Sequence, residues 1–238
     1  MKYLKDLKLD NLIKDKRVII VGPSDYLVGQ GRGEYIDSHD VVCRVNDVIP
    51  KNHELDFGSR TDIMFHSLST RYLANLEKKL AENIDITKAI KLVYCTSVKA
   101  DHSRTGNVID NFNQINKYSL PVSFIGNTNY YWAEAEIGCE PNSGQAAILI
   151  MRQYNIKTLT VVGFSFYAQF SKDGYAACYY DFDAYAPAEK FPITSSPIIG
   201  HQQTPQIEHF KKTVLEDERI LIDQYLKDLL NIDCDRIV

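Results

Sequence analysis

Short runs of apolar and β-branched residues recur along the chain, and the segments between them are long enough to form helices. Successive positions within a run are apolar without a polar alternation, which is typical of strands in a parallel sheet that is buried on both faces. We therefore expect an α/β fold, with a Rossmann-like parallel sheet sandwiched between helices. The expected strands are residues 17–22, 41–45, 62–65, 92–95, 122–125 and 159–164.

Two of the intervening segments carry a clear helical pattern. Residues 69–80 place Leu73, Leu76 and Leu80 at steps of three and four with charged residues between them, which indicates an amphipathic helix. Residues 142–154 are apolar almost throughout, as expected for a helix that is covered on several sides.

The C-terminal stretch also has helical spacing. Apolar residues from Ile207 to Leu229 follow one another at steps of three, four and seven, so we expect a helix with Thr204 as its cap and Pro205 in its first position. His201 then lies in a loop that leads into this helix. The preceding stretch is rich in Tyr, Asp, Ala and Pro without periodicity, which predicts a long loop or lid.

Composition limits the class of protein. The 238 residues contain no low-complexity linker, so we expect a single domain over residues 1–238. The net charge of -4 and the lack of a long Lys/Arg cluster argue against nucleic acid as a partner. No apolar run approaches the roughly 20 residues that cross a bilayer, and the start of the chain is too charged for a signal peptide. The sequence therefore predicts a cytoplasmic protein.

The N-terminal segment, residues 1–16, is basic and amphipathic. Leu4, Leu7, Leu12 and Ile13 fall near one face of a helix among charged residues. We favour a short helix or loop that packs on the edge of the domain with its charged side in water. Peripheral contact with an anionic membrane surface is the alternative.

The cysteines are widely spaced, odd in number and within or beside apolar runs. This pattern suggests neither a disulfide framework nor a zinc site. We interpret them as free thiols that pack as small apolar side chains, and we expect no metal site. They are Cys43, Cys95, Cys139, Cys178 and Cys234.

Two stretches that are far apart in the sequence are predicted to form the two halves of one nucleotide pocket. In residues 17–46, a Gly-Pro-Ser turn follows the first strand and an Arg-Val-Asn sequence ends the second. In residues 141–167, a Pro-Asn-Ser-Gly turn opens the apolar helix and a Gly-Phe-Ser sequence ends the next strand. Ligands of parallel α/β sheets bind at the carboxyl ends of the strands. Both stretches therefore offer phosphate- or sugar-facing loops at one edge of the sheet.

The glycines do not by themselves identify the nucleotide. Gly29, Gly31 and Gly33 do not directly follow a strand with the dinucleotide spacing, and no acidic residue lies at a matching position downstream. This argues against an NAD fingerprint. The chain also lacks a Gly-Lys-Ser/Thr phosphate loop.

The order and spacing of the motifs are more specific. Residues 36–40 read IDSHD, residues 44–46 read RVN, residues 57–62 read FGSRTD and residues 141–144 read PNSG. With the apolar runs around them, these motifs resemble the long and short motifs of the eukaryotic-type sialyltransferases, glycosyltransferase family 29. The resemblance covers most of the chain from residue 17 onward.

The resemblance implies an inverting, metal-independent transfer of an acidic sugar, sialic acid or Kdo, from a CMP-sugar donor to a hydroxyl of a glycan or glycolipid acceptor. It also implies a GT-A-like variant of the fold and no cofactor besides the donor substrate. The backbone N–H groups of Ser143 and Gly144, at the head of a helix, could hold an anion. The donor-binding residues that it suggests are Gly22, Ser24, Asn46, Asn142, Ser143, Gly144, Ser165 and Tyr180.

By the same resemblance His201 is the general base, because imidazole has an unperturbed pKa near neutrality. The last motif of the family has a Glu five positions after this His, whereas Glu208 lies seven positions after His201. His39 is expected in hydrogen bonds between strand and turn. We expect His209 on the surface of the C-terminal helix.

The chain also departs from the family elsewhere. Pro23 replaces an Asn of the first turn, and Cys178 stands where the third motif has a His. Val18 and Asn155 occupy the positions of two cysteines, so the disulfide of the family cannot form.

Two other functions stay open at this point. Asp181 and Asp183 form an Asp-x-Asp pair, which in other glycosyltransferases holds a metal ion on the diphosphate of a UDP- or GDP-sugar. The altered positions Pro23 and Cys178 also leave open a nucleotide-binding module without catalysis.

Overall fold

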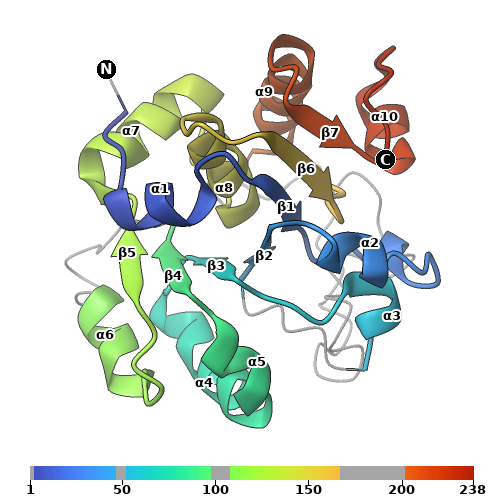
Figure 1. Cartoon of the computed structure of the whole chain (residues 1–238). Coiled ribbons are helices and arrows are strands. Elements are labelled where there is room, and N and C mark those ends of the chain that lie inside the picture. The colour runs from blue at the N-terminus through green and yellow to red at the C-terminus, as the bar shows by residue number, and fades with distance from the viewer. Residues whose placement is uncertain (1–2, 47–51, 98–107, 167–201) are drawn as a thin grey trace, which may run out of the picture.

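The computed structural model describes residues 3–46, 52–97, 108–166 and 202–238. In these parts of the chain seven strands form one sheet in the order β5-β4-β3-β2-β1-β6-β7, and every neighbouring pair is parallel (Figure 1). The Rossmann-like sheet is confirmed, and every expected strand is present: 41–45 and 92–95 have the predicted bounds, and the other four differ by one or two residues at their ends. The strands are β1 (Arg17–Val21), β2 (Val41–Val45), β3 (Ile63–His66), β4 (Leu92–Cys95), β5 (Val122–Phe124), β6 (Thr158–Val162) and β7 (Ile220–Ile222).

The central strands carry apolar side chains on both faces of the sheet. In β1, Val18 and Ile20 belong to one core cluster, while Ile19 and Val21 belong to another. All four side chains are fully buried. This two-sided burial explains why the apolar run shows no polar alternation.

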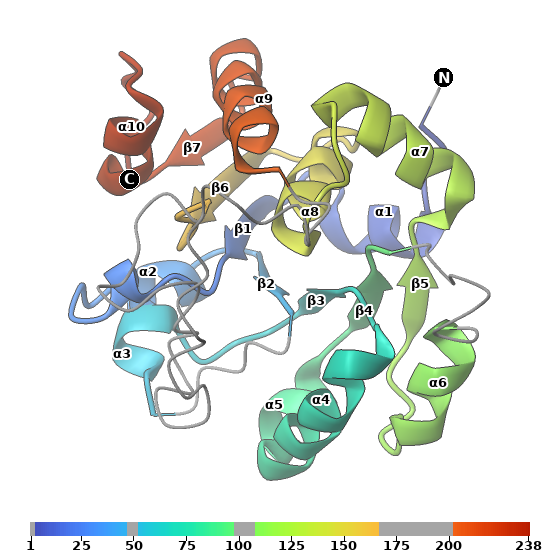
Figure 2. The same cartoon turned by 180° about the vertical axis from the view of Figure 1, so that it is seen from behind.

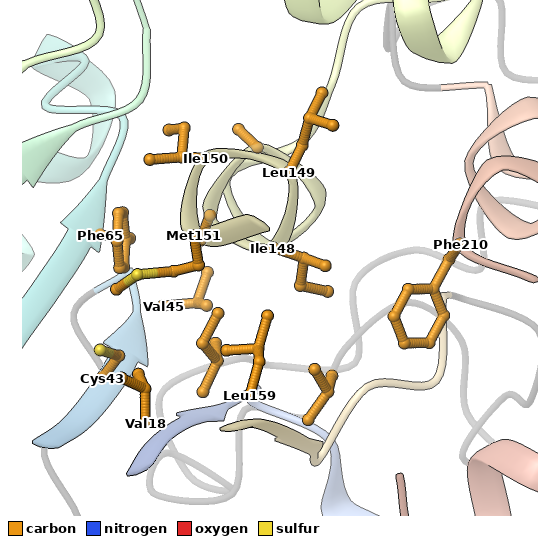
Figure 3. Packing of buried hydrophobic residues seen from close by; sticks show 14 of the residues in the cluster. Val18, Cys43, Val45, Phe65, Ile148, Leu149, Ile150, Met151, Leu159 and Phe210 are labelled. Carbon is orange, nitrogen blue, oxygen red and sulfur yellow. The ribbon is translucent and has the colours of Figure 1, made fainter. Parts of the chain in front are cut away.

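One face of the sheet is covered by helices from both ends of the chain and from its middle (Figures 1 and 2). At the centre of this layer is α8, in which residues 144–151 are all buried, as its apolar sequence predicts. Its side chains share one cluster with Val45 and Phe65 of the sheet (Figure 3). The helices of this layer are α1 (Leu7–Ile13), α7 (Gly126–Ile137), α8 (Ser143–Arg152), α9 (Gln203–Glu216) and α10 (Gln224–Leu230).

The opposite face carries two separate groups of short elements. One group packs on β1, β2 and β6 through Leu27, Ile36 and Phe57. The other packs on β3 and β4, with Leu76 and Phe112 fully buried. The elements of this layer are η1 (Asp25–Leu27), α2 (Gly33–Asp37), α3 (Glu54–Phe57), α4 (Thr70–Glu82), α5 (Ile84–Ala89) and α6 (Val108–Ile115).

The expected C-terminal helix is interrupted by a strand. Helix α9 ends at Glu216, and Ile220–Ile222 then pairs in parallel with β6 as an edge strand before α10 begins. The prediction of one helix was wrong because the apolar residues of β7 and α10 happen to continue the helical spacing. The start was also misplaced, since Gln202 is the cap and Pro205 is the third helical residue. Proline is tolerated there because the first four N–H groups of a helix have no partner within it.

The buried face of the N-terminal segment also differs from the prediction. Leu4 and Leu7 are 62% and 76% exposed, whereas Leu9 and Ile13 are buried. The cause is a pair of hydrogen bonds between the backbone of Leu4 and the side chain of Asn129 on α7, both 2.8 Å long. They hold Leu4 before the helix, which begins at Leu7 after the Asp6 cap, so Leu4 does not share a helical face with the later leucines.

The described cysteines, Cys43, Cys95, Cys139 and Cys234, are buried free thiols, as expected. Burial raises the pKa of the Cys95 thiol to about 11, so this group is neutral at pH 7. Within the described ranges, no helix has the length and apolar character needed to span a membrane.

Phe210 joins α9 to the core (Figure 3). Its ring is fully buried, and its centroid lies 5.0 Å from that of the Phe166 ring. We predict that Phe210→Ala lowers the free energy of unfolding by about 3–5 kcal/mol, because it removes buried contacts and leaves a cavity. Leu215 on the same helix is 52% exposed, so Leu215→Ala should change it by less than about 0.5 kcal/mol. Urea unfolding of both variants checks the prediction, and equal losses would contradict it.

Candidate active site

The order of the strands places a switch point between β1 and β6. From β1 the chain builds the sheet outward in one direction to β5, and it then returns to add β6 and β7 on the other side of β1. In open α/β sheets a ligand binds in the crevice outside the carboxyl ends of the strands at such a point. The predicted residues Gly22 and Ser24 follow β1, and Ser165 follows β6, so they lie at this edge.

The loops after β1 and β6 touch through their backbones. The N–H of Gly22 donates to the carbonyl of Val162 at 2.8 Å, and the N–H of Ser24 donates to the carbonyl of Gly163 at 2.9 Å. A Cβ on Gly22 would lie 2.3 Å from the oxygen of Gly163. Gly163 itself has a φ of 75°, a left-handed conformation that favours glycine. Glycine is therefore required on both sides of this contact.

The ring of Phe164 connects this contact to α8. A Cβ on Gly22 would lie 2.9 Å from Cδ2 of the ring, and a Cβ on Gly144 would lie 2.4 Å from Cε1. The ring thus lies against the two glycines, one from each predicted motif. The structure in this way brings the two motif stretches together at one edge of the sheet.

The N-terminus of α8 opens at this edge. The Oδ1 of Asn142 caps the helix by accepting the N–H of Gln145 at 2.8 Å. The hydroxyl of Thr96, which follows β4, donates to the Ser143 hydroxyl at 3.0 Å. The N–H groups of Ser143 and Gly144 are among the first four of the helix, which have no partner within it, and the helix dipole adds positive potential. The arrangement is suited to hold an anion.

The first turn of α9 is hydrogen-bonded to the N-terminus of α8. Gln206, five positions after His201, is buried, and its Oε1 accepts the N–H of Asn142 at 3.2 Å. Glu208 is exposed. The residue five positions after His201, where the family has its Glu, is therefore Gln206, and it contacts the first turn of α8. Glu208 makes no such contact among the hydrogen bonds of the described residues.

His209 is half-buried rather than on the surface, so this expectation was wrong. Its Nδ1 lies 2.8 Å from the amide nitrogen of Gln145, which is fully buried on α8. Burial lowers the pKa of His209, and the neighbouring Arg152 charge acts in the same direction. The apolar spacing of α9 does not reveal this contact, because it depends on how α9 lies on α8.

Asn46 ends β2 in a left-handed conformation, with a φ of 60°. Its N–H donates to the carbonyl of Phe65 on β3 at 2.6 Å. Asn adopts this conformation more readily than most residues. Asn46 therefore lies at the same edge of the sheet as Gly22, which follows the neighbouring strand β1.

The IDSHD and FGSRTD motifs bind each other. The carboxylate of Asp37 accepts the N–H and the hydroxyl of Ser59 at 2.7 and 2.8 Å and the N–H of Arg60 at 3.1 Å. The Arg60 guanidinium in turn donates to the carbonyl of His39 at 3.0 Å. His39 is in a hydrogen-bonded position between turn and strand, as expected, with its Nε2 3.0 Å from the Thr160 hydroxyl.

Arg44 is a structural residue that the sequence did not identify. Its guanidinium is fully buried and donates to the carbonyls of Phe57 and Arg60 at 2.7 and 3.0 Å. A buried cation is stable only when its donors are satisfied. Arg44 therefore fixes the FGSRTD loop beside the end of β2.

The glycine-rich turn before α2 is closed by a side chain of the protein. The N–H groups of Gly29 and Gly31 donate to the Asp56 carboxylate, each at 2.8 Å. The bond from Gly29 holds the pKa of Asp56 below its usual value. This turn is thus occupied by a carboxylate of the protein itself.

Several predicted residues lie outside the described part of the chain. They are His201, Tyr180, Cys178, Asp181 and Asp183. Among the residues that are described, no group of three His, Cys, Asp or Glu side chains is placed to hold a metal ion.

The family is settled by a comparison of sequences. The model of glycosyltransferase family 29 (sialyltransferase) matches residues 10–190. The chain belongs to glycosyltransferase family 29. It is therefore a glycosyltransferase of the sialyltransferase family, and the resemblance of its motifs is confirmed. No curated protein matches the chain.

Solved structures of sialyltransferases have a similar fold. A mammalian sialyltransferase has a TM-score of 0.57 at 18% identity, covering 92% of this chain and 73% of that one. Its complex with Gal-beta-1-3GalNAc-ortho-nitrophenol has a TM-score of 0.56 at 17% identity, covering 92% and 73%. CstII from Campylobacter jejuni, in complex with CMP-3FNeuAc, has a TM-score of 0.52 at 15% identity, covering 90% and 81%. These likenesses support the GT-A-like architecture.

In this family 29 enzyme, hydrogen bonds join the two segments at which the family's disulfide is expected. The carbonyl of Asn155 accepts the N–H of Asp15 at 2.7 Å, and its side-chain amide donates to the Asp15 carboxylate at 2.6 Å. Val18, the other position concerned, is buried in β1, three residues further on. The enzyme thus links these segments without sulfur.

The contact between Gly144 and Phe164 can be tested by substitution. We predict that Gly144→Ala lowers the free energy of unfolding by about 1–3 kcal/mol through overpacking, although Ala is the better helix former. In the double variant with Phe164→Leu the ring is gone, so its loss should be smaller than the sum of the two single losses. Urea unfolding of the three variants measures this coupling. Additive losses would show that the methyl group does not meet the ring.

Proposed function

We propose that this enzyme transfers an acidic sugar, sialic acid or Kdo, from a CMP-sugar donor to a hydroxyl of a glycan or glycolipid, with inversion and without an obligatory metal ion. Membership of family 29 supports the reaction class. The observation that carries the proposal is the place of the α8 N-terminus, which lies beside the Gly22 and Gly163 contact at the switch point through the ring of Phe164. A related structure holds CMP-3FNeuAc.

The phosphate of the donor would bind at the N-terminus of α8. The N–H groups of Ser143 and Gly144 offer two donors and a favourable dipole. The leaving group is a CMP phosphate that gains negative charge as its bond to the sugar breaks, so donors fixed before the reaction stabilise the transition state. The hydrogen bond from Thr96 to Ser143 helps to hold this turn in place.

The nucleoside would lie along the loops that follow β1 and β2. Gly22, Ser24 and Asn46 provide backbone and small polar groups there. Ser165 follows β6 at the same edge, and we assign it and Tyr180 to the donor as well. Asn142 already caps α8 with its side chain, so its contribution to the donor is to hold the turn.

We assign the general base to His201. Its imidazole would take the proton of the acceptor hydroxyl while the acceptor oxygen bonds to the anomeric carbon from the face opposite CMP. The bond between that carbon and the phosphate oxygen breaks, and its electron pair leaves with CMP. The bond between Gln206 and Asn142, five residues along the chain, supports a position near the α8 N-terminus.

We place the enzyme in the cytoplasm, with glycan or glycolipid acceptors. The exposed side chains of Leu4 and Leu7, next to exposed Lys5 and Lys8, support peripheral contact with an anionic membrane surface.

The nucleotide can be identified by thermal shift with CMP, UDP, GDP and NAD, each in EDTA or with Mn²⁺. At about 100 times its dissociation constant a ligand stabilises the fold by about 2.7 kcal/mol, which raises the Tm of a protein of this size by about 5–10 °C. We expect this shift for CMP in EDTA. A shift for UDP or GDP that requires Mn²⁺ would contradict the proposal and favour a metal at Asp181 and Asp183.

The role of His201 can be separated from donor binding. We predict that His201→Ala lowers transfer about a hundredfold or more, because a general base contributes on that scale. The dissociation constant of CMP should stay within about twofold of the wild-type value, as measured by calorimetry. A large loss of CMP affinity would instead assign His201 to the donor.

A further inference from the structure

The loop after β1 is tied to the C-terminal part of the chain through Tyr26. This tyrosine lies in η1, four positions after Gly22. Its hydroxyl donates to Oδ2 of Asp223 at 2.6 Å and accepts the N–H of Gly163, also at 2.6 Å. One hydroxyl therefore joins the ends of three strands, β1, β6 and β7.

Asp223 is fixed in place by its own contacts. It is 3% exposed and caps α10, with its Oδ1 accepting the N–H of Leu226 at 2.9 Å. The ring of Tyr26 also stacks on Tyr225, with the ring centroids 3.9 Å apart and the planes at 15°. The unit of β7 and α10 thus holds Tyr26 by its ring and by its hydroxyl.

The direction of the hydrogen bonds follows from the chemistry of the three groups. The Gly163 N–H is a donor only, so the Tyr26 oxygen must accept from it and give its single proton to Asp223. Burial, together with the neighbouring Asp223 charge, raises the pKa of Tyr26 well above its usual value, so the hydroxyl stays protonated. A phenylalanine keeps the stack on Tyr225 but leaves both Asp223 and the Gly163 N–H without this partner.

The hydrogen bonds from Asp223 through Tyr26 end at Gly163, which contacts the loop after β1. Gly163 is the residue whose carbonyl accepts the N–H of Ser24 at 2.9 Å and whose oxygen faces Gly22. The Gly163 N–H that Tyr26 binds shares its peptide with the carbonyl of Val162, which accepts the N–H of Gly22 at 2.8 Å. A rotation of this peptide would move the bond to Gly22 directly, and it would move the Gly163 carbonyl, and with it the bond to Ser24, through the backbone of Gly163. The unit that prevents it, β7 with α10, begins at Ile220, beyond residue 190 where the family match ends.

We propose that Tyr26 is a positioning residue for the donor nucleotide: its hydroxyl, held by Asp223, fixes the peptide between Val162 and Gly163 and thereby the Gly22 and Ser24 loop. This inference rests on the proposed function, since it takes that loop to contact CMP. Tyr26 acts through the loop and does not itself touch the reacting atoms. Its loss should therefore raise the Kd of CMP and the KM of the donor more than it lowers kcat.

The test compares Tyr26→Phe with a matched control, Tyr154→Phe. Tyr154 is a buried tyrosine whose hydroxyl, like that of the partly buried Tyr26, accepts a backbone N–H, that of Asp6 at 2.8 Å, but it follows the C-terminal end of α8. We expect Tyr26→Phe to raise the Kd of CMP about tenfold, equivalent to about 1.4 kcal/mol, and to raise the KM of the donor in parallel. Tyr154→Phe should leave the Kd of CMP and the KM of the donor within about twofold of the wild-type values, even if its Tm falls as far as that of Tyr26→Phe.

The outcomes separate this inference from the proposed function. If the wild-type protein binds CMP and Tyr26→Phe binds it equally well, Tyr26 has only a structural role and the inference is wrong. If the wild-type protein prefers another nucleotide, the proposed donor is wrong, and the same pair of variants tests the positioning role with that nucleotide. If it binds none of the four nucleotides, both proposals fail.

Asp223→Asn provides a second variant in case Tyr26→Phe does not fold. Asn keeps the size of the side chain and can still cap α10, but a neutral amide is a weaker acceptor for the Tyr26 hydroxyl than a carboxylate. We expect the Kd of CMP to rise about threefold or more while the Tm stays close to that of the wild type. An unchanged Kd would contradict the inference.

Discussion

The backbone contact between Gly22 and Gly163 is the constraint on which the site depends. Strands β1 and β6 are parallel neighbours, so their loops leave the sheet side by side. With no side chain on either glycine, the loops can hydrogen-bond to each other at the switch point. The same approach presses the ring of Phe164 against Gly144 at the head of α8. A side chain at any of these glycines would separate the groups that the donor is proposed to bridge.

Much of the motif that identifies the family holds the site together rather than touching a ligand. Arg44 is buried and donates to backbone carbonyls of the FGSRTD loop, and Asp37 accepts from the amides of the same loop. The two motifs thus bind each other although about 20 residues separate them in the sequence, and the buried Arg44 finds hydrogen-bond acceptors in this contact. These bonds hold the end of β2 in place, directly before Asn46 with its left-handed backbone at the edge of the sheet.

The C-terminal elements complete the site from outside the region that matches the family. Helix α9 is joined to the head of α8 through Gln206 and Asn142 and through His209 and Gln145. Strand β7 and α10 hold the loop after β1 through Tyr26. The C-terminal elements thus hold both predicted motif stretches, α9 by its bonds to the first turn of α8 and the unit of β7 and α10 by its bond to the loop after β1.

The sequence by itself determined the parallel sheet, the helix of residues 142–154 and the family, because two-sided apolar runs and ordered motifs are local patterns. It also indicated that Gly22 and Gly144 face one edge, because parallel strands end on the same side. Only the tertiary structure decided which residues act as scaffold, how β7 interrupts the C-terminal helix, and which neighbour His209 and Tyr26 contact. The bond from Tyr26 to Asp223 joins residues 197 positions apart, and its strength depends on burial and alignment that no local pattern encodes.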